Sequence, residues 1–266
     1  MPSTRKIPRK ARPLYSAPAL EKGIAILELL SSVHHPLAVA DIATRLRRSR
    51  AEIYRMLVVL ESLDYIRRTD DGQYDLTAKL FEIASRHAPK RSVVTAARAV
   101  MEELAEATLQ SCHLMVNSGD HMVCLAREES PAAIGFSVQV GFRPPMLQST
   151  SGRVYFAFQD EARQELIMSR MRRGKHDAAT LRAFGAGASA LVRRGYAVEP
   201  SRLTTGIRDL SVPIFGAQPG RAVACLTIPF VSHRLFPLGI KETAALLLEA
   251  AGRICANLRA GGPARG

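Results

Sequence analysis

The chain has 266 residues, of which 47% are hydrophobic, 23% are charged and 6% are aromatic. This composition is typical of a folded globular protein and excludes the disordered and fibrous classes. The length favours two folded units of unequal size. The formal net charge of +13 favours a polyanionic partner, because basic side chains that neutralise phosphates release condensed counterions.

The sequence carries no signal for membrane insertion, secretion or metal binding. No stretch approaches the roughly 18 uninterrupted apolar residues of a membrane span, and the basic residues 1–17 lack the apolar core of a secretory signal. We therefore expect a cytoplasmic protein. The four cysteines are scattered without C-x-x-C pairs, so we expect buried thiols and neither a metal nor another cofactor. These cysteines are Cys112, Cys124, Cys225 and Cys255.

Apolar residues recur at helical spacing from Pro18 onward and predict three helices. The first extends to about Ser32, the second covers residues 40–47, and the third starts at Ser49. Ser49 and Glu52 have the S-x-x-E spacing of a capping box. The short connection between the second and third helices predicts a helix-turn-helix. Two short strands then flank an Asp-Gly turn and predict a wing over residues 65–76.

The remainder of the chain predicts a connector and a mixed domain. Residues 77–88 are typical of a helix that Pro89 ends, and a long helix follows over 92–108. Beyond it, strand and helix candidates alternate, which indicates an α+β domain with a largely antiparallel sheet. The strand candidates are 112–117, 122–127, 134–140, 196–199, 207–215 and 221–229, and the helix candidates are 152–158, 161–169, 178–194 and 241–258. The expected organisation is a flexible basic arm 1–17, a winged helix-turn-helix 18–76, a linker helix 77–91, a sensor domain 92–259 and a flexible tail 260–266.

Seven arginines lie between residues 45 and 68, on the predicted turn, third helix and wing. Arg50 is the main candidate for reading bases, because a recognition helix reaches the major groove with its N-terminal residues and arginine can bond guanine bidentately. Any single arginine could instead solvate an exposed helix face, but their convergence on three adjacent surfaces favours DNA contact. Glu52 could accept from a cytosine, although the capping box is the favoured interpretation. The candidate DNA-binding residues are Arg45, Arg47, Arg48, Ser49, Arg50, Tyr54, Arg55, Arg67 and Arg68.

The order and spacing of these segments resemble the IclR family of bacterial transcriptional regulators over residues 17–258. The resembling stretches are 19–27, 42–43, 53–57, 60–66, 71–76, 128–130, 140–145, 152–153, 194–198, 206–208 and 212–215. The resemblance implies a winged helix-turn-helix joined by a linker helix to a GAF-like sensor domain. It also implies a homodimer or dimer of dimers that binds palindromic operators in double-stranded DNA. The chain departs from the family at residues 47–52, where relatives usually have a Gly-Leu-Pro or Gly-Leu-Ser turn, so the operator sequence does not follow from relatives.

The resemblance further implies a sensor that binds a small organic acid, aromatic or hydroxylated, at a loop before a helix. Backbone N–H groups at a helix N-terminus attract anions, and residues 148–152 have this position, although a serine-rich helix cap is the plainer interpretation. Asp209 suits a structural hydrogen bond as well as a ligand contact. If Glu199 and Asp209 line one pocket, a hydroxylated or sugar-like acid fits better than a keto acid. The candidate ligand-binding residues are Met146, Leu147, Ser149, Thr150, Ser151, Glu199, Ile207, Asp209 and Thr227.

Two other functional classes compete with a ligand-responsive regulator. The first is a small-molecule-processing enzyme with an appended DNA-binding domain, but G-x-S-x-G, H-E-x-x-H and phosphate-loop motifs are absent from the sequence. The glycines of residues 185–187 fall inside a predicted helix and not after a strand, unlike a dinucleotide fingerprint. His113 and His233 are lone histidines, more typical of core or surface positions than of catalysts. The second class, a ligand-independent DNA-binding protein, would have no use for the large mixed domain.

Overall fold

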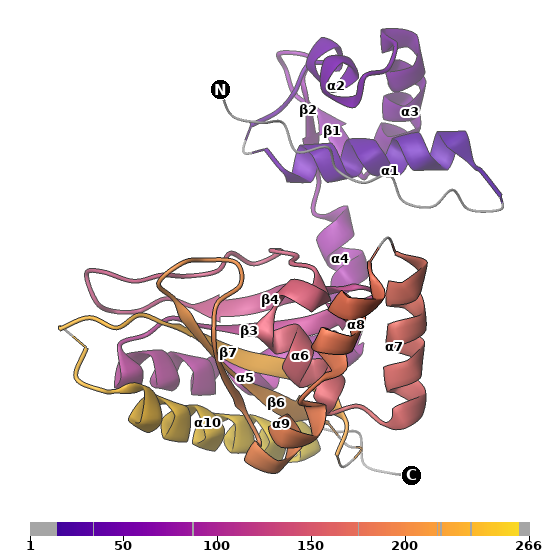
Figure 1. Cartoon of the computed structure of the whole chain (residues 1–266). Helices are drawn as coiled ribbons and strands as arrows, with labels where there is room; N and C mark the ends of the chain where they lie inside the picture. Colours follow the sequence, from indigo (N-terminus) through magenta and orange to yellow (C-terminus); the bar gives the residue numbers. More distant parts are fainter. Residues whose placement is uncertain are drawn as a thin grey trace. The chain divides into compact units, whose positions relative to one another are not determined.

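The computed structural model of the chain describes residues 15–33, 35–86, 88–174, 176–216, 218, 220–234 and 236–260 (Figure 1). The predicted basic arm up to residue 14 and the tail from residue 261 lie outside the described residues. The chain divides into two compact units, on either side of the boundary between residues 87 and 88. In the described residues, no helix combines the length and apolarity that crossing a membrane requires.

The N-terminal unit is a winged helix-turn-helix, as predicted. Helices α1 (Pro18–Ser31), α2 (Val39–Leu46) and α3 (Arg50–Ser62) are followed by strands β1 (Ile66–Arg68) and β2 (Tyr74–Leu76), which pair antiparallel, and by α4 (Lys79–Ser85). Leu37 and Tyr74 exchange two backbone hydrogen bonds of 3.0 and 2.8 Å, so the wing is held against the segment before α2. The shared core consists of Ile26, Leu30, Leu37, Ile42, Ala43, Ile53, Leu57, Ile66 and Tyr74.

The C-terminal unit is built on an antiparallel sheet of five strands in the order β4-β3-β7-β6-β5. The strands are β3 (Cys112–Ser118), β4 (His121–Glu128), β5 (Ala197–Pro200), β6 (Arg208–Phe215) and β7 (Ala222–Phe230). Helices α5 (Ala88–Thr108) and α10 (Ile240–Ala260) lie side by side along one face (Figure 1). Apolar side chains of both helices pack there against alternate strand residues such as Leu114, Val212 and Leu226. The predicted α+β class with a largely antiparallel sheet is confirmed.

The opposite face of the sheet is covered by shorter helices. They are the 3-10 turn η1 (Met146–Gln148), α6 (Thr150–Ala157), α7 (Glu161–Arg173), α8 (Ala178–Gly185) and α9 (Ala188–Arg194). A second apolar cluster, which includes Met115, Met146, Phe156 and Phe184, fills the space between these helices and the sheet. All four cysteines are free and buried, as expected.

Apart from shifts of a few residues at the ends of elements, three sequence-based predictions are wrong. Pro89 does not end a helix; it lies in the first turn of α5, where the missing N–H has no intrahelical acceptor to lose. The predicted helix 178–194 is two helices, because Gly187 adopts a left-handed φ of 80° between them. The predicted strand 134–140 is an irregular loop. Its apolar alternation reflects side chains that enter a cavity, since Phe136 and Val138 line one.

Candidate nucleic-acid interface and effector cavity

The N-terminus of α3 is fixed by a capping box that Ser49 and Glu52 complete. The Ser49 hydroxyl accepts from the Glu52 N–H at 3.3 Å, and the Glu52 carboxylate accepts from the Ser49 N–H at 3.2 Å. Lys22 of α1 donates to the same carboxylate at 2.6 Å. The hydrogen bonds from Lys22 and Ser49 lower the pKa of Glu52 to about 2. The capping-box interpretation of Glu52 is therefore confirmed, and its carboxylate is already occupied within the protein.

All nine candidate DNA-binding residues are exposed in the structure. Helix α3 buries Ile53 and Leu57 in the core and leaves Arg50, Tyr54 and Arg55 on its outer side. Within the described residues, the only one of the seven arginines that forms a salt bridge is Arg67, which pairs with Asp75 across the wing at 3.2 Å. Both partners of that pair are well exposed, so the interaction is weak. The turn and α3 consequently present a group of uncompensated cations.

Arg47 ends α2 in a conformation that usually requires glycine. Its φ and ψ are 54° and 50°, in the left-handed region that costs a side chain about 1–2 kcal/mol. This is the position where the sequence departs from the Gly-Leu turn of the resembled family. The protein thus holds an exposed arginine between α2 and α3 at a cost in backbone strain.

The wing carries the remaining two arginines. Gly72 turns the hairpin with a φ of 73°. The Arg68 guanidinium lies over this turn, since a Cβ added to Gly72 would stand 3.2 Å from Arg68 Nη2. Arg67 and Arg68 are therefore both available at the surface of the hairpin.

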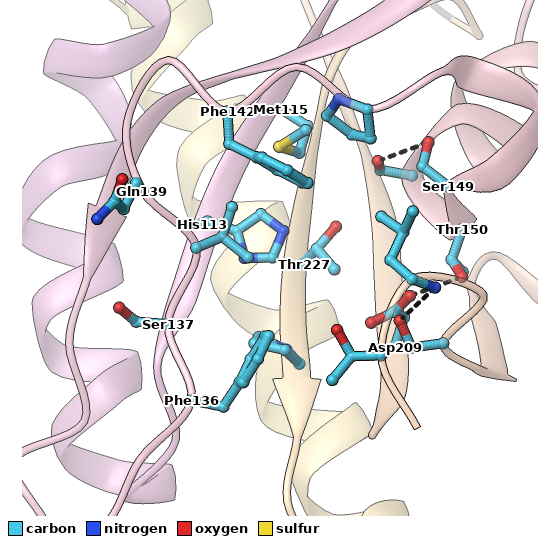
Figure 2. Close-up of a pocket in the computed structure, with 17 residues that line it drawn as sticks. His113, Met115, Phe136, Ser137, Gln139, Phe142, Ser149, Thr150, Asp209 and Thr227 are labelled. Atoms are coloured by element: carbon cyan, nitrogen blue, oxygen red, sulfur yellow. Dashed lines mark hydrogen bonds between the residues drawn. The ribbon is translucent and has the colours of Figure 1, made fainter. Parts of the chain in front are cut away.

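The C-terminal unit contains a cavity of about 540 Å³ on the sheet face opposite α5 and α10 (Figure 2). Its volume suits a small organic molecule. The apolar wall consists of Met115, Phe136, Val138, Phe142, Pro144, Leu203 and Pro229. The polar lining consists of His113, Ser137, Gln139, Ser149, Thr150, Ser151, Ser201, Thr204, Asp209 and Thr227. Among the described lining residues there is no lysine and no arginine.

The structure brings five of the nine candidate ligand residues to this cavity: Ser149, Thr150, Ser151, Asp209 and Thr227. The other four do not line it. Met146 and Leu147 are buried in the apolar cluster beneath α6, and Ile207 precedes β6. Glu199 forms a salt bridge of 2.8 Å with Arg153 of α6. The condition of two acidic groups in one pocket is therefore not met, because Glu199 pairs with Arg153 outside the cavity lining.

Helix α6 begins at the polar end of the cavity. Ser149 caps it by accepting from the Gly152 N–H at 3.0 Å, so the plainer reading of this serine is confirmed. The Thr150 hydroxyl donates to the Asp209 carboxylate at 3.1 Å. Burial raises the pKa of Asp209, while hydrogen bonds from Thr150 and Ser201 oppose that rise. First-turn N–H groups have no intrahelical partner, which leaves those of Thr150 and Ser151 at the cavity.

Several lining residues were not identified from the sequence. As a lone histidine, His113 is more typical of a core or surface position, and Phe136 belongs to the predicted strand 134–140. Strand alternation offered one usable signal: His113 and Met115 are two apart on β3 and share a face of the sheet. The other lining residues that the sequence did not reveal come from loops far apart in the chain, and a local sequence pattern does not show that they lie close together.

Comparisons with known proteins address both units. The model described as "IclR helix-turn-helix domain" matches residues 19–70, and that described as "Bacterial transcriptional regulator IclR C-terminal" matches residues 86–256. The chain belongs to the IclR family. It is thus a transcriptional regulator with a helix-turn-helix DNA-binding domain.

Curated relatives and solved structures agree with membership of the IclR family. The chain is 25% identical to the probable transcriptional regulator SauR of Cupriavidus necator, over 80% of this chain and 85% of that protein. It is 26% identical to the HTH-type transcriptional regulator XynR of Escherichia coli, over 82% and 87%. An IclR homolog from Microbacterium hydrocarbonoxydans, solved as a complex with 4-hydroxybenzoate, shares the fold with a TM-score of 0.75 and 22% identity, over 91% of this chain and all (100%) of that chain. Thermotoga maritima IclR gives a TM-score of 0.64 with 24% identity, over 90% and 98%.

Proposed function

We propose that this IclR-family regulator binds a palindromic operator through α3 and the wing, and that a small organic acid in the C-terminal cavity modulates this binding. The observation that carries the DNA-binding part is the group of exposed, uncompensated arginines on the turn and α3. Such a surface gains affinity for a duplex by counterion release. The cytoplasm is the compartment in which a bacterial regulator meets its operator.

Within this interface the residues have different roles. Arg50 is the first residue of α3 and reads a base edge, with roughly 1–3 kcal/mol of discrimination if it bonds guanine bidentately. Tyr54 and Arg55 follow on the exposed side of the helix and hold phosphates, which position the protein without reading sequence. The remaining candidates on the turn and wing add phosphate or minor-groove contacts. They are Arg45, Arg47, Arg48, Ser49, Arg67 and Arg68.

A palindromic operator requires two copies of the reading helix, so we infer a homodimer or a dimer of dimers. The N-terminal unit exposes large apolar side chains that favour self-association. Leu20 of α1 is 63% exposed, and Phe81 of α4 is 75% exposed.

The effector is an aromatic or hydroxylated acid. Two features of the cavity support this class: an apolar wall that contains Phe136 and Phe142, and a polar end where α6 begins beside Asp209. A carboxylate is accommodated by the free N–H groups at a helix N-terminus. The 4-hydroxybenzoate complex of the Microbacterium hydrocarbonoxydans homolog supports the same class.

The test is DNA binding measured by fluorescence anisotropy on the intergenic fragment beside the protein's own gene and on random DNA, at several salt concentrations. We expect salt-sensitive binding with preference for the specific fragment, and loss of that preference in Arg50→Ala. Arg172→Ala, which alters an exposed arginine of α7, is the matched control. Absence of salt-sensitive binding to any duplex would disprove the proposal. Conversion of a bound acid into a product would favour the enzyme alternative.

A further inference from the structure

His113 is a buried histidine whose imidazole lines the cavity and has a ring nitrogen without a partner. It lies on β3, is only 6% exposed, and forms part of the lining. Its Nδ1 is buried and accepts or donates no hydrogen bond within the described residues. Figure 2 shows the ring directed into the space between Phe142, Phe136 and Thr227.

An unpaired buried nitrogen is costly, and native structures rarely keep one without a reason. The neighbouring polar groups on the sheet do not serve it. Thr227 is the cross-strand neighbour of His113, but the Thr227 hydroxyl is engaged with Ser211 at 2.9 Å. The imidazole therefore has capacity for a hydrogen bond that the protein itself does not use.

The charge state of His113 limits what it can bind. Burial lowers the pKa of His113 to about 4, so the ring is neutral at pH 7 and offers one N–H and one lone pair. A neutral imidazole does not compensate the charge of an effector that carries a second carboxylate. It pairs well with a hydroxyl, which both donates and accepts.

The sheet register sets the distance between His113 and the polar end of the cavity. His113 is paired with Thr227 on β7, and Thr227 is paired with Ser211 on β6. Asp209 lies two residues before Ser211 on the same strand. Two strand spacings amount to about 10 Å and two residues to about 7 Å, so the Cα atoms of His113 and Asp209 are roughly 12 Å apart. Both residues line the cavity. The separation between them fits one six-membered ring with a substituent at each end.

We propose that His113 is a specificity-determining residue that hydrogen-bonds a hydroxyl on the effector, one ring length from the carboxylate held at the start of α6. This inference rests on the proposed function and narrows its effector to acids with a distal hydroxyl. Phe136, Phe142 and Met115 enclose the ring between the two polar ends.

Calorimetry on the full chain with two matched pairs of acids tests the proposal: 4-hydroxybenzoate against benzoate, and 4-hydroxyphenylacetate against phenylacetate. We expect the hydroxylated acid of at least one pair to bind about tenfold more tightly, the ratio that a hydrogen bond to an otherwise unpaired group provides. The ratio should fall to about one in His113→Leu and be largely retained in His113→Asn, whose amide keeps hydrogen-bonding capacity near Nδ1. Val223→Ala, a change at an exposed position of β7 outside the cavity lining, should leave the ratio unaltered.

Nitrogen NMR of the wild-type protein gives a second readout that needs no variant to fold. The ¹⁵N resonances of the His113 ring should move when the hydroxylated acid binds and stay in place with the bare acid. A hydroxyl preference that persists in His113→Leu, equal binding of both acids of each pair, or no binding by all four acids would each overturn the inference. The salt-dependent DNA binding of the same preparation shows separately whether the proposed function stands.

Discussion

Glu199 and Asp209 stand directly opposite each other on β5 and β6, yet among the described residues only Glu199 has a cationic partner. Arg153 reaches Glu199 from α6, whereas Asp209 faces the hydroxyls of Thr150 and Ser201. Burial raises the pKa of Asp209 above its ordinary value of 3.8. In this pair, the Glu199 carboxylate links α6 to the sheet through Arg153, whereas the Asp209 carboxyl lines the cavity, where burial disfavours its charged form.

The raised pKa of Asp209 predicts a pH-dependent stability. The folded state binds this proton more tightly than the unfolded state, so the contribution to stability is present at low pH and is lost as pH rises through the folded pKa. Asp209→Asn removes the ionisable group and keeps a hydrogen-bonding side chain. We expect its melting temperature to exceed that of the wild type at pH 7.5, with the difference shrinking toward pH 4. Glu199→Gln should instead lower the melting temperature, because it leaves Arg153 without its anion.

Gly152 is required by the close approach of η1 to α6. A Cβ at this position would collide with the Met146 carbonyl oxygen and would lie 2.7 Å from Ser149 Oγ. Gly152→Ala should therefore cost about 1–3 kcal/mol in the free energy of unfolding and displace the cap at the cavity, which weakens acid binding. Gly252→Ala in α10, where a Cβ meets nothing within 4 Å, should be neutral or stabilising by up to about 1 kcal/mol. Equal effects of the two changes in urea unfolding would contradict the packing argument.

Arg47→Gly should separate stability from DNA affinity. Glycine adopts the left-handed φ without penalty, so we expect a gain of about 1 kcal/mol in unfolding free energy. Loss of a phosphate contact should at the same time weaken binding to all duplexes and reduce the salt slope by about 1. Arg45→Ala, in the regular part of α2, should reduce the slope without the gain in stability. A stability loss in Arg47→Gly would show that the arginine side chain makes contacts that outweigh the strain.

The lowered pKa of Glu52 predicts that the stability of the N-terminal unit decreases in acid. Its pKa is lowered from 4.5 to about 2 by Lys22 and Ser49, so its contribution to stability is complete above about pH 4.5 and is lost as pH falls toward 2. Glu52→Gln should flatten this part of the acid titration of helicity, followed by circular dichroism. Glu28→Gln, at an exposed position of α1, should leave the titration curve unchanged.

Arg50 and Arg55 should differ in the kind of DNA binding that they support. Arg50→Ala should relax preference at one base pair in each half-site, at a cost of about 1–3 kcal/mol on the specific operator. Arg55→Ala should weaken binding to specific and random DNA by similar factors and reduce the salt slope by about 1. Competition anisotropy against single-base operator variants measures both effects. Equal losses of Arg50→Ala on every duplex would assign Arg50 to a phosphate.

The features that could be predicted from the sequence depend on interactions within a few residues. The two residues of the cap, Ser49 and Glu52, are three positions apart, and the turn at Gly72 closes a hairpin between adjacent strands. Helical periodicity likewise reports a buried face one turn at a time. These signals located the helix-turn-helix, the wing and most strands of the sheet.

The composition of the cavity depends on contacts between distant parts of the chain. Glu199 is a predicted pocket residue, but its carboxylate pairs with Arg153, which lies 46 residues earlier in the chain, and does not line the cavity. His113 shares the cavity with Thr227 of β7 and with Phe136, which lies in the segment 134–140 that local alternation predicts as a strand. A local pattern indicates whether a side chain is apolar and which way it faces. Which partners meet it there, and whether a polar atom stays unpaired, follows from the packing of segments that lie a hundred residues apart.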